Sequence, residues 1–398
     1  MKVQLSPDEF DGTMTRRDVL RHLGIVSVGL AATPVPGFPA WWFTGQDAVL
    51  PFTDMPDGFN GLRAQGPEQH PGQNLRAQDL RAVESWLTPV EDFFVVGHYG
   101  YPALDAASWA LRVRGLVERP ATLSLDQLRA RPRVERTTVF ECSGNSRGTF
   151  HGMVGNATWA GTPLLPLLDE AGLMADTREI HFWAADTGTE EIRGGEYEQK
   201  FARSMSMQQI REREPILAYE MNGEPLTVVH GFPVRLIVPG WYGVCQVKWL
   251  TDIEASHDRL MTRFMARDYV TLMGEEVDGE VEWVETSVTR QRPKSVIARV
   301  TRQADRMTVF GVAWSDGTPL DRVEVSLDGG GAVAADLESQ GDAYTWSFFS
   351  AGFPLPATGE HTVVSRATDT EGRTQPDNLE MKRTRWENNE LFERTIRI

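Results

Sequence analysis

The stretch Val139–Gly161, VFECSGNSRGTFHGMVGNATWAG, decides how the rest of the chain is interpreted. Within it Cys142, one of two cysteines, follows the β-like run Arg136–Glu141 and precedes the small polar turn Ser143–Ser146. A strand that ends in a thiol beside a glycine turn presents the sulfur at a loop edge, where a ligand can approach the backbone closely. Arg147 follows, and its permanent positive charge favours thiolate and attracts an anion. The alternative for a lone cysteine is a small, buried hydrophobic side chain.

The composition sets the first limits on function. The length of 398 residues predicts two domains, and 41% hydrophobic residues with 12 tryptophans suffice for substantial cores. The formal charge of −16 argues against a nucleic-acid partner, because nothing would release phosphate counterions. It suits a small anion drawn into a local basic pocket or a basic protein partner, and plain solubility explains it equally well.

The two cysteines, Cys142 and Cys245, form no CxxC pair, haem attachment site or zinc spacing. Their number allows one disulfide, which we do not expect if either thiol binds a metal. Cys245 is interpreted as a buried packing residue.

Residues 1–40 have the order of an export signal. Thr15–Leu20 (TRRDVL) precedes the apolar run Leu23–Thr33 and then prolines, which resembles a twin-arginine signal. The run is too short to span a bilayer, and the alternative is an amphipathic helix. We therefore expect a periplasmic or otherwise extracytoplasmic protein, and the cleavage site stays open.

The remaining chain divides into three parts. Residues 41–83 are an extended lead-in rich in Gly, Pro, Asp and Gln. Residues 84–285 mix short strands with short helices, which predicts an α+β catalytic domain. The strands include 92–98, 109–116 and 244–253, the helices are 124–131, 163–172 and 207–213, and Asp186 lies in a turn. Residues 286–398 hold evenly spaced β-like runs typical of a β-sandwich, at 296–300, 306–314, 322–327, 344–349 and 361–369.

A set of short motifs follows the Cys142 strand in a fixed order. They are Trp159–Gly161 (WAG), Tyr219–Gly223 (YEMNG), His230–Arg235 (HGFPVR), Pro239–Leu250 (PGWYGVCQVKWL) and Arg267–Tyr269 (RDY). Together with Phe140–Arg147 (FECSGNSR), they resemble the sulfite oxidase family of molybdenum enzymes in both order and spacing. The resemblance covers residues 84–398 and implies that 286–398 is an immunoglobulin-like dimerisation domain.

The resemblance implies a molybdenum–molybdopterin cofactor and assigns residues to it. Cys142 would be the one protein thiolate on molybdenum, a soft ligand beside the two dithiolene sulfurs of the cofactor. The matched cofactor-binding positions are His98, Cys142, Asp186, His230, Arg235, Gln246, Val247 and Lys248, of which Gln246 and Val247 would act through their backbone. Arginine and lysine suit a phosphate, and an ionised aspartate suits the N–H groups of the pterin. Singly, His230 would be a structural histidine and Lys248 a surface charge.

Two further positions match the family's substrate pocket. Arg147 would hold an oxyanion by paired hydrogen bonds, and Tyr269 would assist proton movement during turnover. The alternative for Tyr269 is a partly exposed loop tyrosine.

Two departures leave the substrate open. Val96 stands where sulfite-oxidising members have an arginine, although His98 is kept. The late Asn-Leu-Arg-Gly string of some members is absent, and Arg383 or Arg385 is a candidate replacement. Losing one charged anion contact costs about 1.5–3 kcal/mol, or roughly a tenfold to more than hundredfold loss of affinity.

The resemblance implies a homodimer that oxidises sulfite to sulfate by oxygen-atom transfer, and the twin-arginine pattern predicts that it is exported. The sequence lacks haem, flavin and nicotinamide motifs, so the electrons would pass to an external acceptor such as a c-type cytochrome. One alternative is a reductase of sulfoxides or another oxo-substrate, which the neutral Val96 favours. Another is a cofactor-free secreted binding module.

Overall fold

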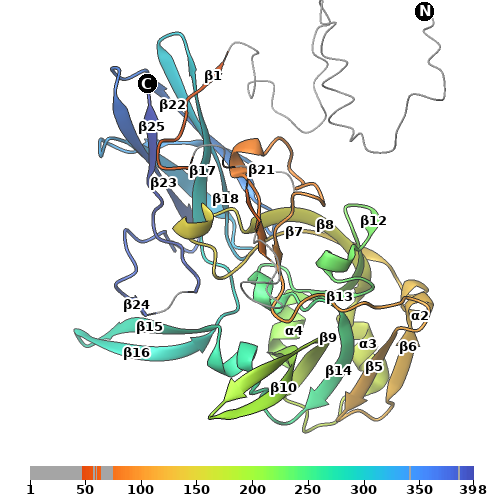
Figure 1. The fold of residues 1–398 in the computed structure, drawn as a ribbon. Coiled ribbons are helices and arrows are strands. Elements are labelled where there is room, and N and C mark those ends of the chain that lie inside the picture. The colour runs from red at the N-terminus through yellow and green to blue at the C-terminus, as the bar shows by residue number, and fades with distance from the viewer. Residues whose placement is uncertain (1–46, 57–58, 60, 64–74, 340–341, 384–385) are drawn as a thin grey trace, which may run out of the picture. The chain divides into compact units, whose positions relative to one another are not determined.

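The computed structural model describes residues 47–398 except 57–58, 60, 64–74, 340–341 and 384–385 (Figure 1). The predicted export signal, the start of the lead-in and Arg385 lie outside the described residues. The described residues belong to one compact unit of the chain. Within that part, no helix is long and apolar enough to cross a membrane.

The predicted helices form where the sequence places them. They are α2 (Leu125–Arg129), α3 (Leu164–Ala171) and α4 (Met207–Arg213). Ser124 starts α2 because its hydroxyl accepts from the Gln127 amide at 3.2 Å while the Gln127 side chain accepts from the Ser124 amide at 2.8 Å. Gly172 ends α3 in the left-handed conformation. These helices are short and most other elements are strands, so the described fold is mostly β, with less helix than we expected from an α+β domain.

Two sheets build the catalytic part. One has the order β10-β9-β14-β5-β6 and contains β5 (Ala110–Gly115), β6 (Ala121–Ser124), β9 (Glu179–Ile192), β10 (Gly195–Ser206) and β14 (Leu250–Ser256). The other has the order β12-β11-β8-β7, with β13 also on β11, and contains β7 (Val134–Glu141), β8 (Val154–Pro163), β11 (Ile216–Met221), β12 (Glu224–Pro225) and β13 (Arg235–Ile237). One core contains Phe182 and Ile253 of the first sheet, Leu217 and Leu236 of the second, and Leu168 of α3. Helix α3 therefore packs where the two sheets share one apolar interior.

Two local predictions in this part were wrong. Asp186 lies inside β9 rather than in a turn, at a register shift where Lys200 of β10 pairs with Thr187 but Ala202 pairs with Trp183. Such a bulge re-aims side chains, which a sequence pattern of small polar residues does not distinguish from a turn. The expected strand 244–253 is instead a 3₁₀ turn, Gly243–Cys245, followed by an irregular segment and then β14. By contrast, Asn222 and Gly223, at φ 52° and 83°, form the predicted hairpin turn between β11 and β12.

Two further sheets form the C-terminal β domain. One has the order β1-β17-β18-β22-β21 and contains β1 (Ala48–Val49), β17 (Lys294–Gln303), β18 (Arg306–Trp314), β21 (Asp336–Ser339) and β22 (Ser347–Pro354). The other has the order β20-β19-β23-β25 and contains β19 (Leu320–Leu327), β20 (Val333–Ala334), β23 (Glu360–Asp369) and β25 (Arg394–Arg397). Val300 and Val309 of the first sheet share a core with Val323 and Val363 of the second. The five β-like runs predicted here correspond to β17, β18, β19, β22 and β23.

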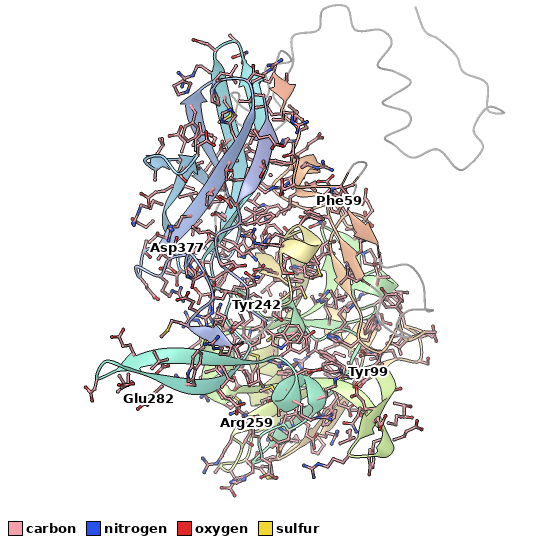
Figure 2. The ribbon with its side chains drawn as sticks, turned by 60° about the vertical axis from the view of Figure 1, so that its left-hand side comes forward. Phe59, Tyr99, Tyr242, Arg259, Glu282 and Asp377 are labelled. Atoms are coloured by element: carbon pink, nitrogen blue, oxygen red, sulfur yellow. The ribbon has the colours of Figure 1, made fainter. Side chains whose placement is uncertain are left out.

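An unpredicted hairpin lies between the two parts of the chain. It consists of β15 (Val270–Val277) and β16 (Glu280–Ser287), with β24 (Lys382–Arg383) alongside β15. Residues 275–286 are all exposed, and Figure 2 marks Glu282 on this ribbon. A smaller sheet near the start of the described chain has the order β2-β3-β4 and contains β2 (Leu62–Arg63), β3 (Leu75–Ala77) and β4 (Val95–Val96).

A buried aspartate joins segments that are distant in sequence. Asp316, fully buried, accepts from Arg290 at 2.5 Å and from Arg373 at 2.8 Å, and its carboxylate lies 3.7 Å from Arg213 of α4. Burial alone would raise the pKa of this carboxyl, but hydrogen bonds from Arg373 and the charges of Arg373 and Arg290 hold it well below its usual value. Asp316 therefore links α4 of the catalytic part to the C-terminal β domain.

Asp316→Asn is expected to lower the free energy of unfolding by about 1–3 kcal/mol, because it removes the counter-charge of buried Arg213 and of the partly exposed Arg290 and Arg373, whose charges water screens. Because the folded pKa is depressed, the carboxylate's contribution is complete above its usual pKa and is lost as the pH falls through the folded value. Denaturant unfolding at pH 7 and at lower pH measures both effects. The control is Asp321→Asn, since Asp321 is half exposed. Equal stabilities for the two variants at pH 7 would contradict this role.

Candidate active site

Eight of the ten predicted site residues line one cavity of about 620 Å³, a volume that includes the open space at its mouth. They are His98, Cys142, Asp186, His230, Arg235, Gln246, Lys248 and Tyr269. Four of them lie at or near the ends of strands. Cys142 follows β7, Arg235 begins β13, Lys248 precedes β14 and Tyr269 precedes β15.

One region of the cavity carries buried positive charge. Arg235 donates to the carbonyls of His230 at 2.8 Å and Gln246 at 3.1 Å, and its Nε has no hydrogen-bond partner among the described residues. Lys248 Nζ donates to the carbonyls of Val96 and Val229, each at 3.0 Å. Neither cation forms an ion pair within the part of the chain that the structure describes. Two desolvated cations with donors to spare fit an anionic group such as a phosphate.

The pKa values reflect this desolvation. Burial lowers the pKa of Arg235 to about 9. Burial, followed by the charge of Arg235, lowers the pKa of Lys248 to about 7, although Asp186 opposes the shift. Burial likewise raises the pKa of Asp186 to about 7, against the charge of Lys248. A bound anion would favour the charged form of Lys248. Because the pKa values of Lys248 and Asp186 both lie near 7, these side chains can change their charge when an anion binds.

Acceptors and neutral groups lie in the same cavity. Asp186 is buried, and its Oδ1 has no hydrogen-bond partner among the described residues, so it can accept from a ligand N–H. His230 Nε2 lies 3.0 Å from the Val90 carbonyl and donates to it, and burial lowers the pKa of His230 to about 3, which keeps the ring neutral. An N–H-rich ring system with an anionic tail therefore matches the acceptors and the cations of the cavity.

Gln246 and Val247 have scaffolding contacts. The Gln246 side chain accepts from the Val238 amide at 2.6 Å and donates to the carbonyls of Val238 and Trp241 at 2.8 and 2.9 Å. These bonds occupy the amide and leave the Gln246 backbone at the cavity. Val247 is fully buried, does not line the cavity, and accepts from the Leu236 amide at 2.8 Å.

A thiol and a hydrogen-bonded pair complete the cavity. Cys142 is a free cysteine with 8% of its surface exposed, and burial raises the pKa of its thiol to about 11. A metal ion deprotonates such a thiol by coordinating it, so the position suits a metal ligand better than a free nucleophile. Tyr269 Oη and His98 Nε2 lie 2.7 Å apart, and burial is the main cause that lowers the pKa of His98 to about 3. The phenol therefore pairs with a neutral imidazole.

Arg147 does not line the cavity. Its side chain is 53% exposed and donates to the Leu391 carbonyl at 3.1 Å, while its guanidinium lies 3.7 Å from Glu390 and 5.4 Å from the Phe392 ring centroid. The motif predicts a substrate contact for Arg147, but partners more than 240 residues away hold the side chain. Val96 does line the cavity, so its neutral side chain occupies part of the wall.

Sequence reasoning missed a second buried pair beside Cys142. Glu141 and Lys294, each 1% exposed, form an ion pair, and Glu141 also accepts from Asn145 at 3.0 Å and Trp314 at 3.3 Å. Because Lys294 and Trp314 belong to the C-terminal β domain, that domain contacts the residue next to the thiol. No local sequence signal connects positions so far apart.

These features define a class of protein. A buried soft ligand, a cationic anion site and unpartnered acceptors fit a metal carried on an anionic pterin, and two domain matches agree. Residues 98–264 match the oxidoreductase molybdopterin binding domain, and residues 281–397 match the Mo-co oxidoreductase dimerisation domain. The protein is a molybdopterin-dependent oxidoreductase with a molybdenum–molybdopterin cofactor.

Similar proteins place it more narrowly. The chain is 30% identical over 368 residues to "Sulfite oxidase" of Arabidopsis thaliana, covering 80% of this chain and 91% of that one. It is 31% identical over 369 residues to "Sulfite oxidase" of Gallus gallus, covering 84% and 77%. The crystal structure of the sulfane dehydrogenase SoxCD from Paracoccus pantotrophus superposes with a TM-score of 0.71 at 26% identity, covering 84% of this chain and 87% of that one. The chain belongs to the sulfite oxidase family, which excludes the cofactor-free binding module.

Proposed function

We propose that this enzyme oxidises sulfite to sulfate by oxygen-atom transfer and passes the electrons to an external acceptor such as a c-type cytochrome. The observation that carries the proposal is the single cavity in which Cys142 and the Tyr269–His98 pair accompany the cationic group of Arg235 and Lys248. The similarity to two proteins named sulfite oxidase supports the direction of the reaction. The twin-arginine pattern supports export, and the dimerisation-domain match supports a homodimer formed through an immunoglobulin-like β-sandwich.

The proposed roles follow from the chemistry of each side chain. Arg235 and Lys248 would hold the phosphate of the cofactor, and Asp186 would accept from its pterin. Cys142 would ligate molybdenum. The bound cofactor would supply the chemistry of oxygen-atom transfer and of two-electron oxidation and reduction. Tyr269 would hold or move a proton at its phenol oxygen, with neutral His98 as its hydrogen-bond partner.

A second candidate function keeps the cofactor and takes a substrate of lower charge. Val96 lines the cavity in place of an arginine, and Arg147 is bonded to the C-terminal segment instead of facing the cavity. Both observations favour a neutral sulfur compound. The reaction would be either reduction of a sulfoxide or oxidation of sulfane sulfur, the activity named for the similar Paracoccus protein.

Parallel steady-state assays distinguish the candidates. One assay combines sulfite with oxidised cytochrome c, a second combines a sulfane compound with the same acceptor, and a third combines methionine sulfoxide with reduced viologen. We expect turnover in the first. Turnover confined to the second or third would refute sulfite oxidation and support the second candidate.

Val96→Arg is expected to lower the KM for sulfite about tenfold or more, because one charged contact to an anion contributes about 1.5–3 kcal/mol. Steady-state kinetics with sulfite measure the change, and molybdenum content confirms that the variant retains its cofactor. The matched control is Val96→Leu, which changes size without adding charge. An unchanged KM in a fully loaded Val96→Arg variant would show that this wall does not contact the anion.

A further inference from the structure

One aromatic residue of the C-terminal segment, Trp386, contacts two parts of the active site without lining the cavity itself. The indole of Trp386 stacks on the ring of Tyr269, with centroids 4.1 Å apart and an interplanar angle of 23°. It also reaches the turn after the thiol, because a methyl group added at Gly144 would lie 3.2 Å from Trp386 Cζ3 and 3.9 Å from Cys142 Sγ. The indole therefore spans from the phenol of Tyr269 to the turn that carries the metal ligand.

Hydrogen bonds of the next residue, Glu387, hold Trp386 in place. The amide of Glu387 donates to the Ser143 carbonyl at 2.7 Å, which ties this segment directly to the Cys142 turn. Buried Lys382 donates to the Glu387 carbonyl at 2.6 Å and to Asn389 Oδ1 at 3.0 Å. These bonds are made within the protein, so they hold the segment that carries Trp386 without a contact to the cofactor.

Tyr269 needs such support. Its backbone has φ of 57°, the left-handed region that a bulky side chain adopts only when its surroundings hold it there. Its phenol oxygen must also stay 2.7 Å from His98 Nε2. A stacked indole on one face of the ring restricts where that oxygen can point. Proton transfer is sensitive to such placement, because a misplacement of about 1 Å can cost roughly 100-fold in rate.

We propose that Trp386 is a positioning residue that holds the Tyr269 phenol against His98, so that the C-terminal domain completes the active site. The role in turnover rests on the proposed function of Tyr269, whereas the contact itself does not. Arg383, a candidate for the missing anion clamp, has its guanidinium 5.0 Å from the exposed Trp283 ring on the β15–β16 hairpin. The C-terminal segment therefore places a neutral aromatic ring, that of Trp386, beside Tyr269.

The kinetic test uses two substitutions and a control. Trp386→Ala is expected to lower kcat roughly 10- to 100-fold with KM changed less than threefold, because the phenol is displaced while the residues that line the cavity are kept. Trp386→Phe keeps a stacking ring and should recover most of kcat. Trp283→Ala removes an exposed indole and should leave kcat unchanged. Equal kcat for Trp386→Ala and wild type, at equal molybdenum content, would overturn the positioning role.

A spectroscopic test separates this inference from the proposed function. The chain has seven tyrosines, so protein grown with 3-fluorotyrosine has seven ¹⁹F resonances, and Tyr269→Phe identifies one of them. In Trp386→Ala that resonance should shift or broaden, with or without cofactor, while the other six stay in place. An unmoved resonance would refute the contact. A shifted resonance in an enzyme that oxidises no sulfite would uphold the contact and reject sulfite as the substrate.

Discussion

Cys142→Ser is expected to reduce turnover by more than about 100-fold while the protein stays folded. Substituting a residue that only hydrogen-bonds to a metal ligand already lowers metal affinity or activity about 10- to 100-fold. Removing the ligand itself should therefore cost more. Serine fits because it is smaller than cysteine, but its hydroxyl is a hard and weakly acidic ligand in place of a soft thiolate. For the purified variant, molybdenum content measures metal binding, the unfolding midpoint measures stability, and kcat measures turnover.

The second cysteine is the matched control. Cys245 is buried and free, and its sulfur lies 3.4 Å from Arg203 and 3.5 Å from the Val288 carbonyl, outside the residues that line the cavity. Cys245→Ser should therefore keep its activity. A fully active Cys142→Ser variant would disprove the ligand assignment.

Lys248→Met is expected to weaken retention of the cofactor about tenfold to more than 100-fold. The substitution keeps an unbranched apolar chain but removes a charged hydrogen bond to an anion, which contributes about 1.5–3 kcal/mol. Molybdenum per chain after extended dialysis measures the loss, with the exposed Lys200→Met as control. Unchanged molybdenum retention in Lys248→Met would show that the anionic group is held elsewhere.

The same lysine predicts a pH dependence of cofactor binding. In the protein without cofactor the pKa of Lys248 is about 7, below its usual 10.5, and a bound anion raises it. Binding therefore takes up a proton above pH 7, so the contribution of Lys248 to affinity is complete below that value and falls as the pH rises through it. In the wild type, the rate of molybdenum loss should increase as the pH is raised from 6.5 to 9. Lys248→Met should lack most of this increase, and parallel profiles would contradict the assignment.

Local patterns predicted most of the scaffold. Ser124 and Gly172 act through bonds to residues within one helical turn, so their helices could be located from the sequence. Asn222 and Gly223 supply the two positive φ angles of their hairpin for the same local reason. Asp186 and the segment 244–253 were misassigned because the register of neighbouring strands determines a bulge or an irregular segment.

The cofactor class could be predicted from the chain alone, because Cys142, Arg235 and Lys248 each lie in a short motif of fixed spacing. The surroundings of those motifs depend on contacts that no local pattern encodes. Arg147 is held by a carbonyl 244 residues away, and Trp386 meets Tyr269 only because strands of the C-terminal domain bring it there. Hydrogen bonds and ring stacking act over a few ångströms in space, whatever the separation along the chain. The motifs therefore identify the cofactor, and the tertiary structure decides which side chains face the substrate.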